Sequence, residues 1–305
     1  MTEVSQARRS GQIDLHLHST ASDGTLAPRA IVELAASMGL QTISITDHDS
    51  IGGVAEAQEA GRALGIEIVP GVELSADSSA GDCHILGYYV RIDDQDFTMW
   101  LEARRSARIE RGKEIVKRVN AELRRRGSVS VPQLWWDDVA KRANIDEGGA
   151  VGRPHVADAL VAIGAVASRD DAFATLLGNG MAGDVHYDKV SPNDVIDTIR
   201  RAGGVAVLAH PTYFPEFERQ LPALIEAGLE GLECVYGDYS PHLMEQLCKV
   251  ATSHGLAITG GSDFHGPGLK AGSGGVGVPA VSADLLEPLR ARRTMNPHSP
   301  RHQSG

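Results

Sequence analysis

In the N-terminal part of the chain, short apolar runs alternate with longer segments in which apolar positions recur every three or four residues. The short runs predict strands at residues 13–18, 42–45, 67–69 and 85–90. The longer segments predict helices at residues 29–38 and 54–64, and the first of these is opened by Pro28 and closed by Gly39. Strands that alternate with helices in this way are typical of parallel β/α units.

The pattern changes in the middle of the chain and later returns. Residues 94–192 contain no convincing strand, and helices are predicted there at 97–126, 154–163 and 169–177. Further along, strands are predicted at 204–209, 231–235 and 256–259, with helices at 193–202, 217–227 and 241–254. The β/α alternation therefore resumes after a helical interruption.

This order predicts one β/α domain in two parts, residues 12–93 and 193–292, separated by a helical insertion subdomain at 94–192. The segments 1–11 and 293–305 are polar and lack hydrophobic periodicity, so we expect them to be disordered tails.

The composition is that of a globular protein with a full core. Of 305 residues, 42% are hydrophobic and 23% are charged. No apolar run approaches the roughly 20 residues that span a bilayer, and the polar N-terminus does not resemble a secretory signal. Cys83, Cys234 and Cys248 form no CxxC pair, which argues against a disulfide framework or a thiolate metal site. We expect a cytoplasmic protein with no membrane partner.

The charge balance limits the partners. A formal net charge of −11 gives the chain no global attraction for a nucleic-acid backbone, so duplex DNA is not an expected partner. A small phosphorylated nucleotide, or the 5′ end of a short RNA, remains a candidate if basic residues converge locally. Nothing in the sequence identifies a protein partner.

Histidine and acidic residues recur where predicted strands end. His16 and His18 close the first strand, and because they are two residues apart their side chains point to the same face. Asp23 follows in the loop after this strand. Similar residues after later strands are His48, Glu73, His210, Asp263 and His265, and His84 must be brought to them by the fold. Because the carboxyl ends of strands in β/α barrels share one rim, we expect these side chains to converge.

The joint pattern indicates metal binding more strongly than any single residue does. An isolated histidine or aspartate is more often structural, and a His-x-His pair also arises by chance. A structural role for each residue does not explain why so many lie at strand ends. Imidazole nitrogens together with carboxylate oxygens suit Mn, Fe or Zn, and nine such residues are too many for one ion.

A family is identifiable from these motifs in combination. The segments DLHLHSTASDGTL, ITDHDS, PGVELS, HILGYY, GRPHVA, GGVAVLAHP and GSDFHG resemble the PHP (polymerase and histidinol phosphatase) family, in particular its phosphoesterases that act on nucleoside bisphosphates and short RNA. The resemblance implies a distorted (β/α)7 TIM-like barrel with an inserted helical subdomain. It also implies three divalent ions, with Mn expected first and Fe, Zn or Mg as alternatives.

The resemblance further implies how the nine residues share the ions. One ion would be held by His16, His18, Glu73 and Asp263, which would also hold the reacting water. The second would be held by Glu73, His84 and His210, so that Glu73 bridges two ions. The third would be held by Asp23, His48 and His265. No ligand position of the family is missing, and the presence of Asp23 instead of histidine matches the bisphosphatase-like members.

Two aspartates flank one of these ligands. We interpret Asp47 and Asp49 as carboxylates that orient imidazoles by accepting their N–H bonds. For Asp49, helix capping or a turn is an equally good interpretation.

Arginines provide candidate phosphate ligands. Arg104, Arg108 and Arg111 share one helix face and are either a phosphate clamp or a solvated face paired with nearby glutamates; Arg108 and Arg111 are the better candidates. Arg153 and His155 lie in a Gly-Arg-Pro-His motif at a predicted helix start, where anions are favoured. The resemblance implies that this motif binds the substrate phosphate, and an ordinary helix start is the alternative.

These expectations lead to a metal-dependent phosphoric ester hydrolase. We expect it to hydrolyse the phosphate ester of a nucleoside 3′,5′-bisphosphate by a metal-activated hydroxide, and also to remove 5′ nucleotides from short RNA. Another small phosphomonoester, such as histidinol phosphate, is the alternative substrate. A non-catalytic metal-binding or polymerase-accessory PHP domain is the alternative of another class.

Overall fold

Eight strands form one curved sheet in the computed structural model, which describes residues 12–78, 80–127, 133–185, 190–269, 275–296 and 298. In the order β7-β6-β5-β4-β3-β2-β1-β8, each strand pairs with its neighbour in the sheet. The strands are β1 (Gln12–Leu17), β2 (Thr42–Ile45), β3 (Glu67–Ser78), β4 (Gly81–Tyr88), β5 (Val205–Leu208), β6 (Gly231–Tyr236), β7 (Ala257–Gly261) and β8 (Val281–Ser282).

The two ends of the sheet meet, so that the sheet nearly closes into a barrel. The amide of Asp263, just after β7, donates to the carbonyl of His16 on β1 at 2.9 Å, and the amide of His18 donates to the carbonyl of Phe264 at 2.9 Å. β1–β2–β3 and β5–β6–β7 are parallel, whereas β4 is antiparallel to both of its neighbours and β8 to β1. The expected distorted TIM-like barrel is confirmed.

Helices cover the outside of the strands. They are α2 (Pro28–Ser37), α3 (Val54–Leu64), α8 (Pro192–Arg201), α9 (Phe217–Glu226), α10 (Pro241–Ser253) and α11 (Leu286–Met295), with short helices η3 (Pro211–Tyr213) and η4 (Ala283–Leu285). Leu17 and Ile43 pack with Ile31 and Val32 of α2 in one buried cluster. A larger cluster joins β3–β7 to α8, α9 and α10. This apolar burial fixes the strands and therefore the loops that follow them.

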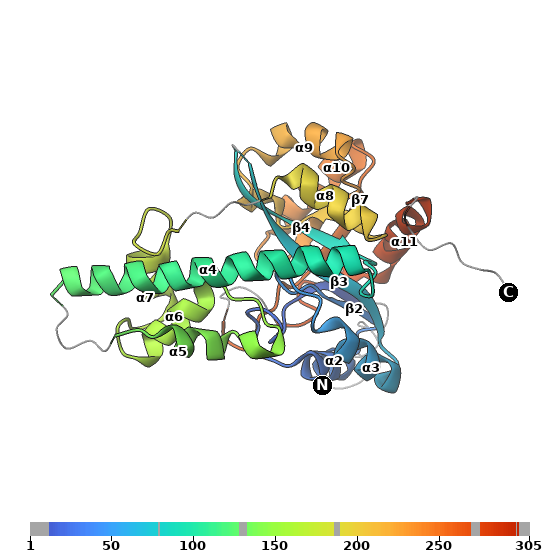
Figure 1. The fold of residues 1–305 in the computed structure, drawn as a ribbon. Coiled ribbons are helices and arrows are strands. Elements are labelled where there is room, and N and C mark those ends of the chain that lie inside the picture. The colour runs from blue at the N-terminus through green and yellow to red at the C-terminus, as the bar shows by residue number, and fades with distance from the viewer. Residues whose placement is uncertain are drawn as a thin grey trace.

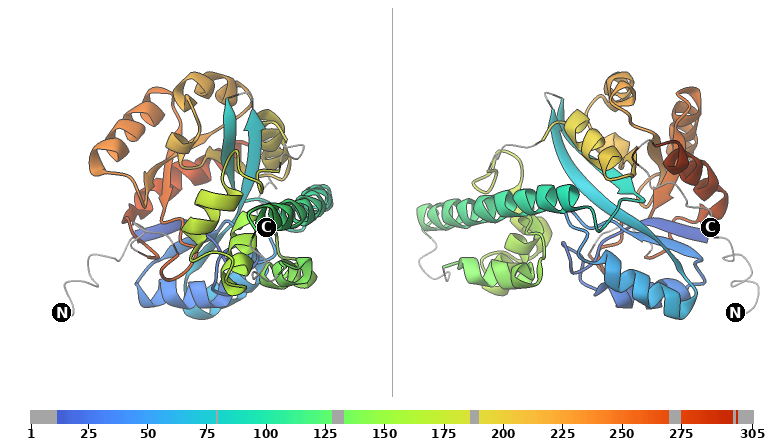
Figure 2. Two further views of the ribbon diagram at one scale, coloured as in Figure 1. Left: turned by 90° about the vertical axis from the view of Figure 1, so that its left-hand side faces the viewer. Right: turned by 45° about the vertical axis from the view of Figure 1, so that its right-hand side comes forward.

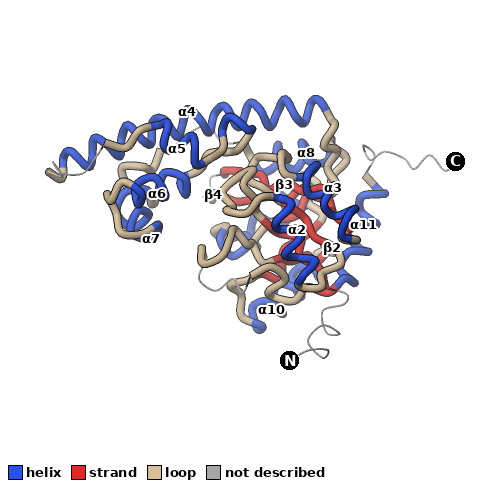
Figure 3. Tube along the Cα trace, turned by 90° about the horizontal axis from the view of Figure 1, so that it is seen from below, coloured by secondary structure: helices blue, strands red, loops and turns tan. Residues whose placement is uncertain are grey.

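The segment between β4 and β5 is helical in its described residues. It contains α4 (Gln95–Arg125), α5 (Trp136–Arg142), η1 (Ile145–Glu147), α6 (Arg153–Ala162), α7 (Arg169–Ala172) and the π-helix η2 (Phe173–Leu177). α4 starts beside the barrel and extends well past it, and α5–α7 lie along its far half (Figures 1 and 3). These helices bury an apolar cluster of their own, which supports the proposed insertion subdomain at 94–192.

The hairpin of β3 and β4 is longer than the strands predicted at 67–69 and 85–90, and Figure 2 shows it rising past the other strands. Pro70 and Gly71 suggested a strand end, but β3 continues through them. A Cβ at position 71 would lie 2.1 Å from Ser44 Oγ, so this glycine permits close approach to β2.

Two smaller differences concern a predicted helix and the C-terminal end. The predicted helix at 169–177 is α7 followed by the π-helix η2. The start of the segment expected to be a disordered tail, 293–305, is ordered, because α11 runs to Met295 and the buried Asn296 side chain donates to the carbonyls of Arg200 and Gly204 at 2.9 and 2.8 Å. Residues 297 and 299–305 lie outside the described residues. The tail expected at 1–11 lies outside the described residues.

Among the described helices, none has the length and apolar character needed to cross a membrane.

Candidate metal centre

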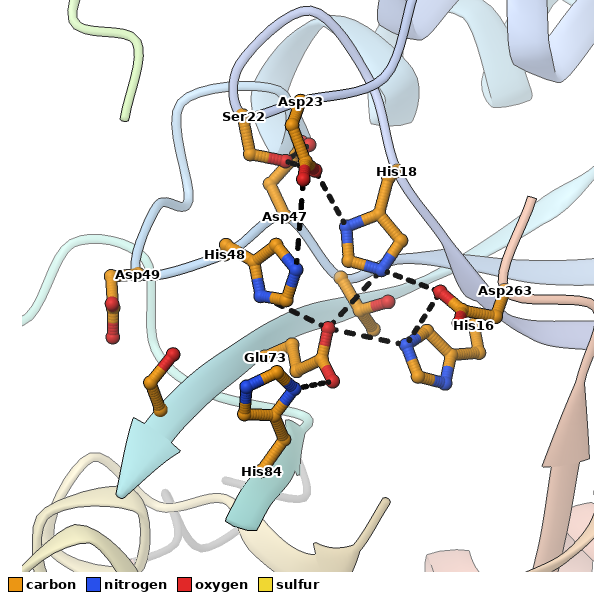
Figure 4. A network of polar contacts seen from close by, with 12 residues as sticks. His16, His18, Ser22, Asp23, Asp47, His48, Asp49, Glu73, His84 and Asp263 are labelled. Carbon is orange, nitrogen blue, oxygen red and sulfur yellow. Dashed lines mark hydrogen bonds and ion pairs between the residues drawn. The ribbon is translucent and has the colours of Figure 1, made fainter. Parts of the chain in front are cut away.

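The nine predicted ligands meet at one end of the barrel. They come from the ends of β1, β5 and β7, from β3 and β4, and from the loops after β1 and β2; Figure 4 shows His16, His18, Asp23, His48, Glu73, His84 and Asp263 pointing toward one another. His210 and His265 join the same group through Glu73 and Asp23. The convergence expected from the strand ends is therefore present.

One oxygen of Glu73 faces three imidazoles. Oε2 lies 3.3 Å from His16 Nε2, 3.2 Å from His18 Nε2 and 3.1 Å from His48 Nδ1. Glu73, His16 and His18 are almost fully buried. Three nitrogens gathered around one carboxylate oxygen are an arrangement that a shared cation would satisfy.

The other oxygen of Glu73 faces two further imidazoles. Oε1 lies 2.8 Å from His84 Nδ1 and 2.9 Å from His210 Nε2. Because the two oxygens are directed at different histidines, this carboxylate has the geometry to bridge two ions.

Two aspartates complete the cluster. Asp263 Oδ1 lies 3.1 Å from His18 Nε2 and 3.5 Å from His16 Nε2. Asp23 Oδ1 lies 3.3 Å from His265 Nε2, and its Oδ2 lies 3.9 Å from His48 Nε2. Asp23 therefore belongs to a second part of the cluster, which His265 links to Asp263 through a distance of 3.4 Å between Nδ1 and Oδ1.

Several nitrogen and oxygen atoms of the cluster lack hydrogen-bond partners within the described part of the chain and are placed to bind cations. Among the described residues, the buried atoms without a hydrogen-bond partner include His16 Nε2, both ring nitrogens of His18, His48 Nδ1 and Glu73 Oε2. Such orphaned groups are costly in a protein interior unless an ion or water satisfies them. Four sets of ligand atoms lie within 4.8 Å of one another: His18-Asp23-His48-His265, His16-Glu73-His210, His16-His18-Asp263 and His48-Glu73-His84.

The carboxylates of the cluster remain ionised. Burial would raise the pKa of Glu73, but the neighbouring charges of His48 and His84 hold that pKa well below its usual range. The pKa values of Asp23 and Asp263 are lowered in the same way, against burial, by nearby imidazoles. Three ionised carboxylates in a buried site are suited to divalent cations.

Backbone strain accompanies this geometry. Asp49, His210 and Asp263 have φ angles of 49°, 25° and 52°, which side chains with a Cβ seldom adopt. The amide of each donates a hydrogen bond, from Asp49 to the Glu73 carbonyl, from His210 to Glu233 Oε2 and from Asp263 to the His16 carbonyl. Strained backbone conformations that neighbouring hydrogen bonds stabilise are common at functional sites, where side chains must point in a particular direction.

The flanking aspartates do not have the role that we predicted. Asp47 accepts hydrogen bonds from Ser19 and from the hydroxyl of Ser22, so it fixes the loop after β1 that carries Asp23. Asp49 is bound by two arginines instead of an imidazole. The carboxylate that does orient a ligand imidazole is Glu233, an interior residue of β6 that the sequence analysis missed.

Arg104 and Arg108 are anchored to Asp49. Arg104 Nε donates to Asp49 Oδ1 at 2.8 Å, and Arg108 Nε donates to Asp49 Oδ2 at 2.6 Å; all three side chains are less than 10% exposed. Arg108 also donates to Ser75 Oγ at 3.0 Å and to the Val151 carbonyl at 3.3 Å. These arginines join α4 to the barrel, and the solvated face considered as an alternative is wrong for both.

His155 does not face the cleft as a phosphate ligand. It is buried, its Nδ1 accepts from the Gly152 amide at 3.0 Å, and its Nε2 donates to the Ser22 carbonyl at 3.0 Å. Burial lowers its pKa, which favours this neutral form. The predicted phosphate-binding role is replaced by a structural one, in which His155 ties the start of α6 to the loop that carries Asp23.

A cleft of about 200 Å³ lies beside the cluster, and we call it the inner cleft. It is lined on the barrel side by Asp23, His48, Ser75, Ala76, Asp82 and His84, and on the insertion side by Arg108, Arg111, Gly152, Arg153, Pro154 and Phe173. Three of the four predicted phosphate ligands, Arg108, Arg111 and Arg153, therefore line the same cleft as three predicted metal ligands. This cleft can place an anionic group next to the metal centre.

The comparisons with known proteins agree with this geometry. The model of the PHP domain family matches residues 14–131. A 3′,5′-nucleoside bisphosphate phosphatase from Chromobacterium violaceum is 32% identical over 288 residues, covering 92% of this chain and 97% of that protein. The 5′-3′ exoribonuclease Rnm of Escherichia coli is 34% identical over 260 residues, covering 83% of this chain and 85% of that protein.

The fold comparison gives the same result. A solved structure from Bifidobacterium adolescentis, described as a metal-dependent phosphoesterase, aligns with a TM-score of 0.81 and 34% identity, covering 92% of this chain and 96% of that one. The resemblance seen in the sequence motifs is confirmed along nearly the whole chain. The chain belongs to the PHP domain family of metal-dependent phosphoesterases.

Proposed function

We propose that this protein hydrolyses a phosphate ester of a nucleoside 3′,5′-bisphosphate. The observation that carries the proposal is Glu73, whose two oxygens face five imidazole nitrogens directly beside a cleft lined by arginines. The similarity to the bisphosphate phosphatase of Chromobacterium violaceum supports the substrate class.

We propose three divalent ions shared as the family resemblance implies. His16, His18, Glu73 and Asp263 would hold the first, Glu73 with His84 and His210 the second, and Asp23 with His48 and His265 the third. Mn is the ion we expect, with Fe, Zn or Mg as alternatives. When bound, such ions neutralise the phosphate and make water a stronger nucleophile.

The residues of the chain supply the rest of the site. Arg111 and Arg153 line the inner cleft and carry the guanidinium groups that bind phosphate oxygens. Arg108 contributes positive charge to the same wall while it remains bound to Asp49. The helices of the insertion subdomain thus form one side of a substrate site whose other side is the barrel.

Removal of 5′ nucleotides from short RNA is a second candidate activity. The similarity to the exoribonuclease Rnm of Escherichia coli favours it. Both activities place a phosphate ester of a nucleotide at the metal cluster, so one site can serve both. We place the protein in the cytoplasm, because a reducing compartment suits cysteines that form no disulfide among the described residues.

The decisive experiment compares substrates on protein loaded with a known metal. Metal content is measured first, and kcat/KM is then compared for a nucleoside 3′,5′-bisphosphate, a short 5′-phosphorylated RNA and histidinol phosphate. We expect the bisphosphate to be the most efficient substrate. Equal efficiency for histidinol phosphate would contradict the ranking, and no hydrolysis with Mn, Fe or Zn bound would indicate an accessory domain instead of an enzyme.

A ligand substitution links the activity to the cluster. Asp263→Asn should lower kcat/KM by at least about a hundredfold, because changes to groups that merely support metal ligands already cost about 10–100-fold. Asp197→Asn is the matched control, since Asp197 is 52% exposed and pairs with Arg201 on the surface of α8. Wild-type activity of Asp263→Asn with unchanged metal content would refute the ligand assignment.

A further inference from the structure

A second cavity adjoins the inner cleft, and we call it the outer pocket. Its volume is about 340 Å³, within the size range of about 300–1,000 Å³ that small-molecule sites occupy. Asp82, Arg111 and Arg153 line both cavities. A substrate whose phosphate lies at the cluster can therefore extend past these three side chains into the outer pocket.

The wall between the two cavities is held in place. Arg111 Nε donates to the Val185 carbonyl at 2.8 Å. Arg153 Nη1 donates to the Leu177 carbonyl at 3.2 Å and to Asn179 Oδ1 at 3.3 Å. Two guanidinium groups are therefore fixed where the two cavities meet.

An aromatic ring lies at the outer pocket. Tyr213 lines the outer pocket and is 55% exposed, although large aromatic side chains are usually buried. Its ring centroid lies 5.3 Å from that of His210, a member of the metal cluster, and its hydroxyl donates to Asp238 Oδ2 at 3.3 Å. An exposed ring anchored at both ends beside a reactive site offers a flat surface for another ring.

Polar side chains also line the outer pocket, beside the apolar Val185 and Pro215. Asn179 and Asp184 line it together with Asp82, so carbonyl and carboxylate oxygens are available to accept hydrogen bonds. Asp184 is itself held by the Gly180 amide at 2.8 Å. Amino groups of a base and hydroxyls of a ribose are the donors that suit such acceptors.

We propose that the outer pocket binds the nucleoside part of the substrate, with the base stacked on Tyr213. The inference rests on the proposed function, since it identifies the position of the base for a nucleotide whose phosphate lies at the metal cluster. Tyr213 would determine specificity for nucleotides over phosphate esters that lack a base. It would act on substrate binding, while metal binding depends on other residues.

The test compares a nucleoside 3′,5′-bisphosphate with the methyl riboside 3′,5′-bisphosphate, which carries both phosphates but no base. Tyr213→Ala should lower the ratio of the two kcat/KM values by about tenfold, the loss expected for one stacked base. Tyr213→Phe keeps the ring and should keep the ratio. Trp135→Ala is the control, because Trp135 is a 61% exposed aromatic side chain outside the residues that line either cavity, and it should also keep the ratio.

Two results would overturn the proposal. One is an unchanged ratio in Tyr213→Ala, and the other is an equal loss for both substrates, which would indicate an effect on the phosphate or the metals. The metal content of each variant is measured as well. An equal loss for both substrates with unchanged metal content indicates an effect on phosphate binding, and an equal loss with lowered metal content indicates an effect on the metals.

Binding gives a readout that does not depend on turnover. Calorimetry should show that the metal-loaded wild type binds adenosine 5′-monophosphate more tightly than ribose 5-phosphate, and that Tyr213→Ala reduces this difference. Equal affinities in the wild type would overturn the outer-pocket assignment even if hydrolysis is observed. Failure to hydrolyse either bisphosphate, with the binding difference intact, would contradict the proposed function and leave the assignment of the pocket supported.

Discussion

Glu233 connects two residues of the candidate metal centre, His16 on β1 and His210 after β5. Its Oε1 accepts a hydrogen bond from His16 Nδ1 at 2.8 Å, and its Oε2 accepts one from the His210 amide at 2.7 Å. Because a carboxylate only accepts, Nδ1 of His16 carries a proton, and Nε2, which faces Glu73 and Asp263, is the nitrogen left to bind a cation. Glu233 thereby fixes the tautomer that a metal ligand needs.

An irregularity in β6 allows two of its residues, Glu233 and Tyr236, to contact the predicted metal ligands. The pairing of β6 with β7 shifts register between Glu233 and Val235. As a result Tyr236, three residues after Glu233, also reaches the cluster, where its hydroxyl donates to Asp263 Oδ2 at 2.6 Å. In a regular strand two residues spaced by three would point to opposite faces.

Substitution of Glu233 should therefore weaken metal binding without removing a ligand. Glu233→Gln preserves the shape of the side chain, but its amide no longer supplies two anionic acceptors. We expect metal affinity to fall by about 10–100-fold, measured by titration of the metal-free protein. Glu245→Gln, on the exposed face of α10, is the control. Wild-type affinity in Glu233→Gln would show that the carboxylate has only a packing role.

A comparison of Glu233 with the predicted ligands shows which residues of the site can be predicted from the sequence. His16, His18 and Asp263 could be predicted because they stand at strand ends, in motifs whose combination is specific. Glu233 lies inside a strand of otherwise apolar character, GLECVY, and belongs to no motif. Its only signal was a charged residue in a buried strand, which must find a partner, but the partner is 217 residues away.

The arginines show a second limit. Arg104, Arg108 and Arg111 were placed on one helix face correctly, but their spacing does not reveal which of them meets Asp49 and which lines only the cleft. That division depends on the angle at which α4 crosses the barrel. The fold class was predictable from the order of strands and helices, whereas the length of the β3–β4 hairpin depended on a glycine that packs against a neighbouring strand.

The buried ion pairs of Asp49 should contribute measurably to stability. Asp49→Asn leaves two guanidinium groups in a nearly buried environment with no opposite charge from this position, while asparagine still tolerates the positive φ of 49°. We expect a loss of about 3–5 kcal/mol in the free energy of unfolding, measured with denaturant. Glu245→Gln removes an exposed pair and should cost less than about 1 kcal/mol. Similar losses in the two variants would contradict this interpretation.

The same pairs predict a dependence of stability on acid pH. Burial would raise the pKa of Asp49, but Arg108 and Arg104 lower it from 3.8 to about 2. Because the folded pKa is the lower one, the stabilisation is complete above about pH 4 and is lost as the pH falls from there toward 2, a change of about 2 kcal/mol. Melting temperatures of the wild type and Asp49→Asn should therefore converge over this range. A constant difference between them would exclude Asp49 as the titrating group.

His155 should act through the loop that carries Asp23. His155→Phe fills the same space but leaves the Gly152 amide and the Ser22 carbonyl without their partners. We expect a loss of about 2 kcal/mol in the free energy of unfolding and weaker binding of the ion that Asp23 is proposed to hold, seen as a lower metal content per chain. A direct role of His155 in phosphate binding would instead raise KM and leave metal content and stability unchanged.

Metal binding should release a proton from His18, because the raised pKa of this imidazole keeps it protonated near neutral pH when no cation is bound. Burial opposes protonation of His18, but the close carboxylates of Asp263 and Glu73 raise its pKa from 6.5 to about 10. Imidazole must be deprotonated on the coordinating nitrogen to bind a metal, so at pH 8 the addition of Mn²⁺ should displace at least the proton of His18. Calorimetric titration in two buffers of different ionisation enthalpy measures the number released. His18→Ala should release fewer protons than the wild type, and a wild-type value of zero would mean that the cluster holds His18 neutral before the cation arrives.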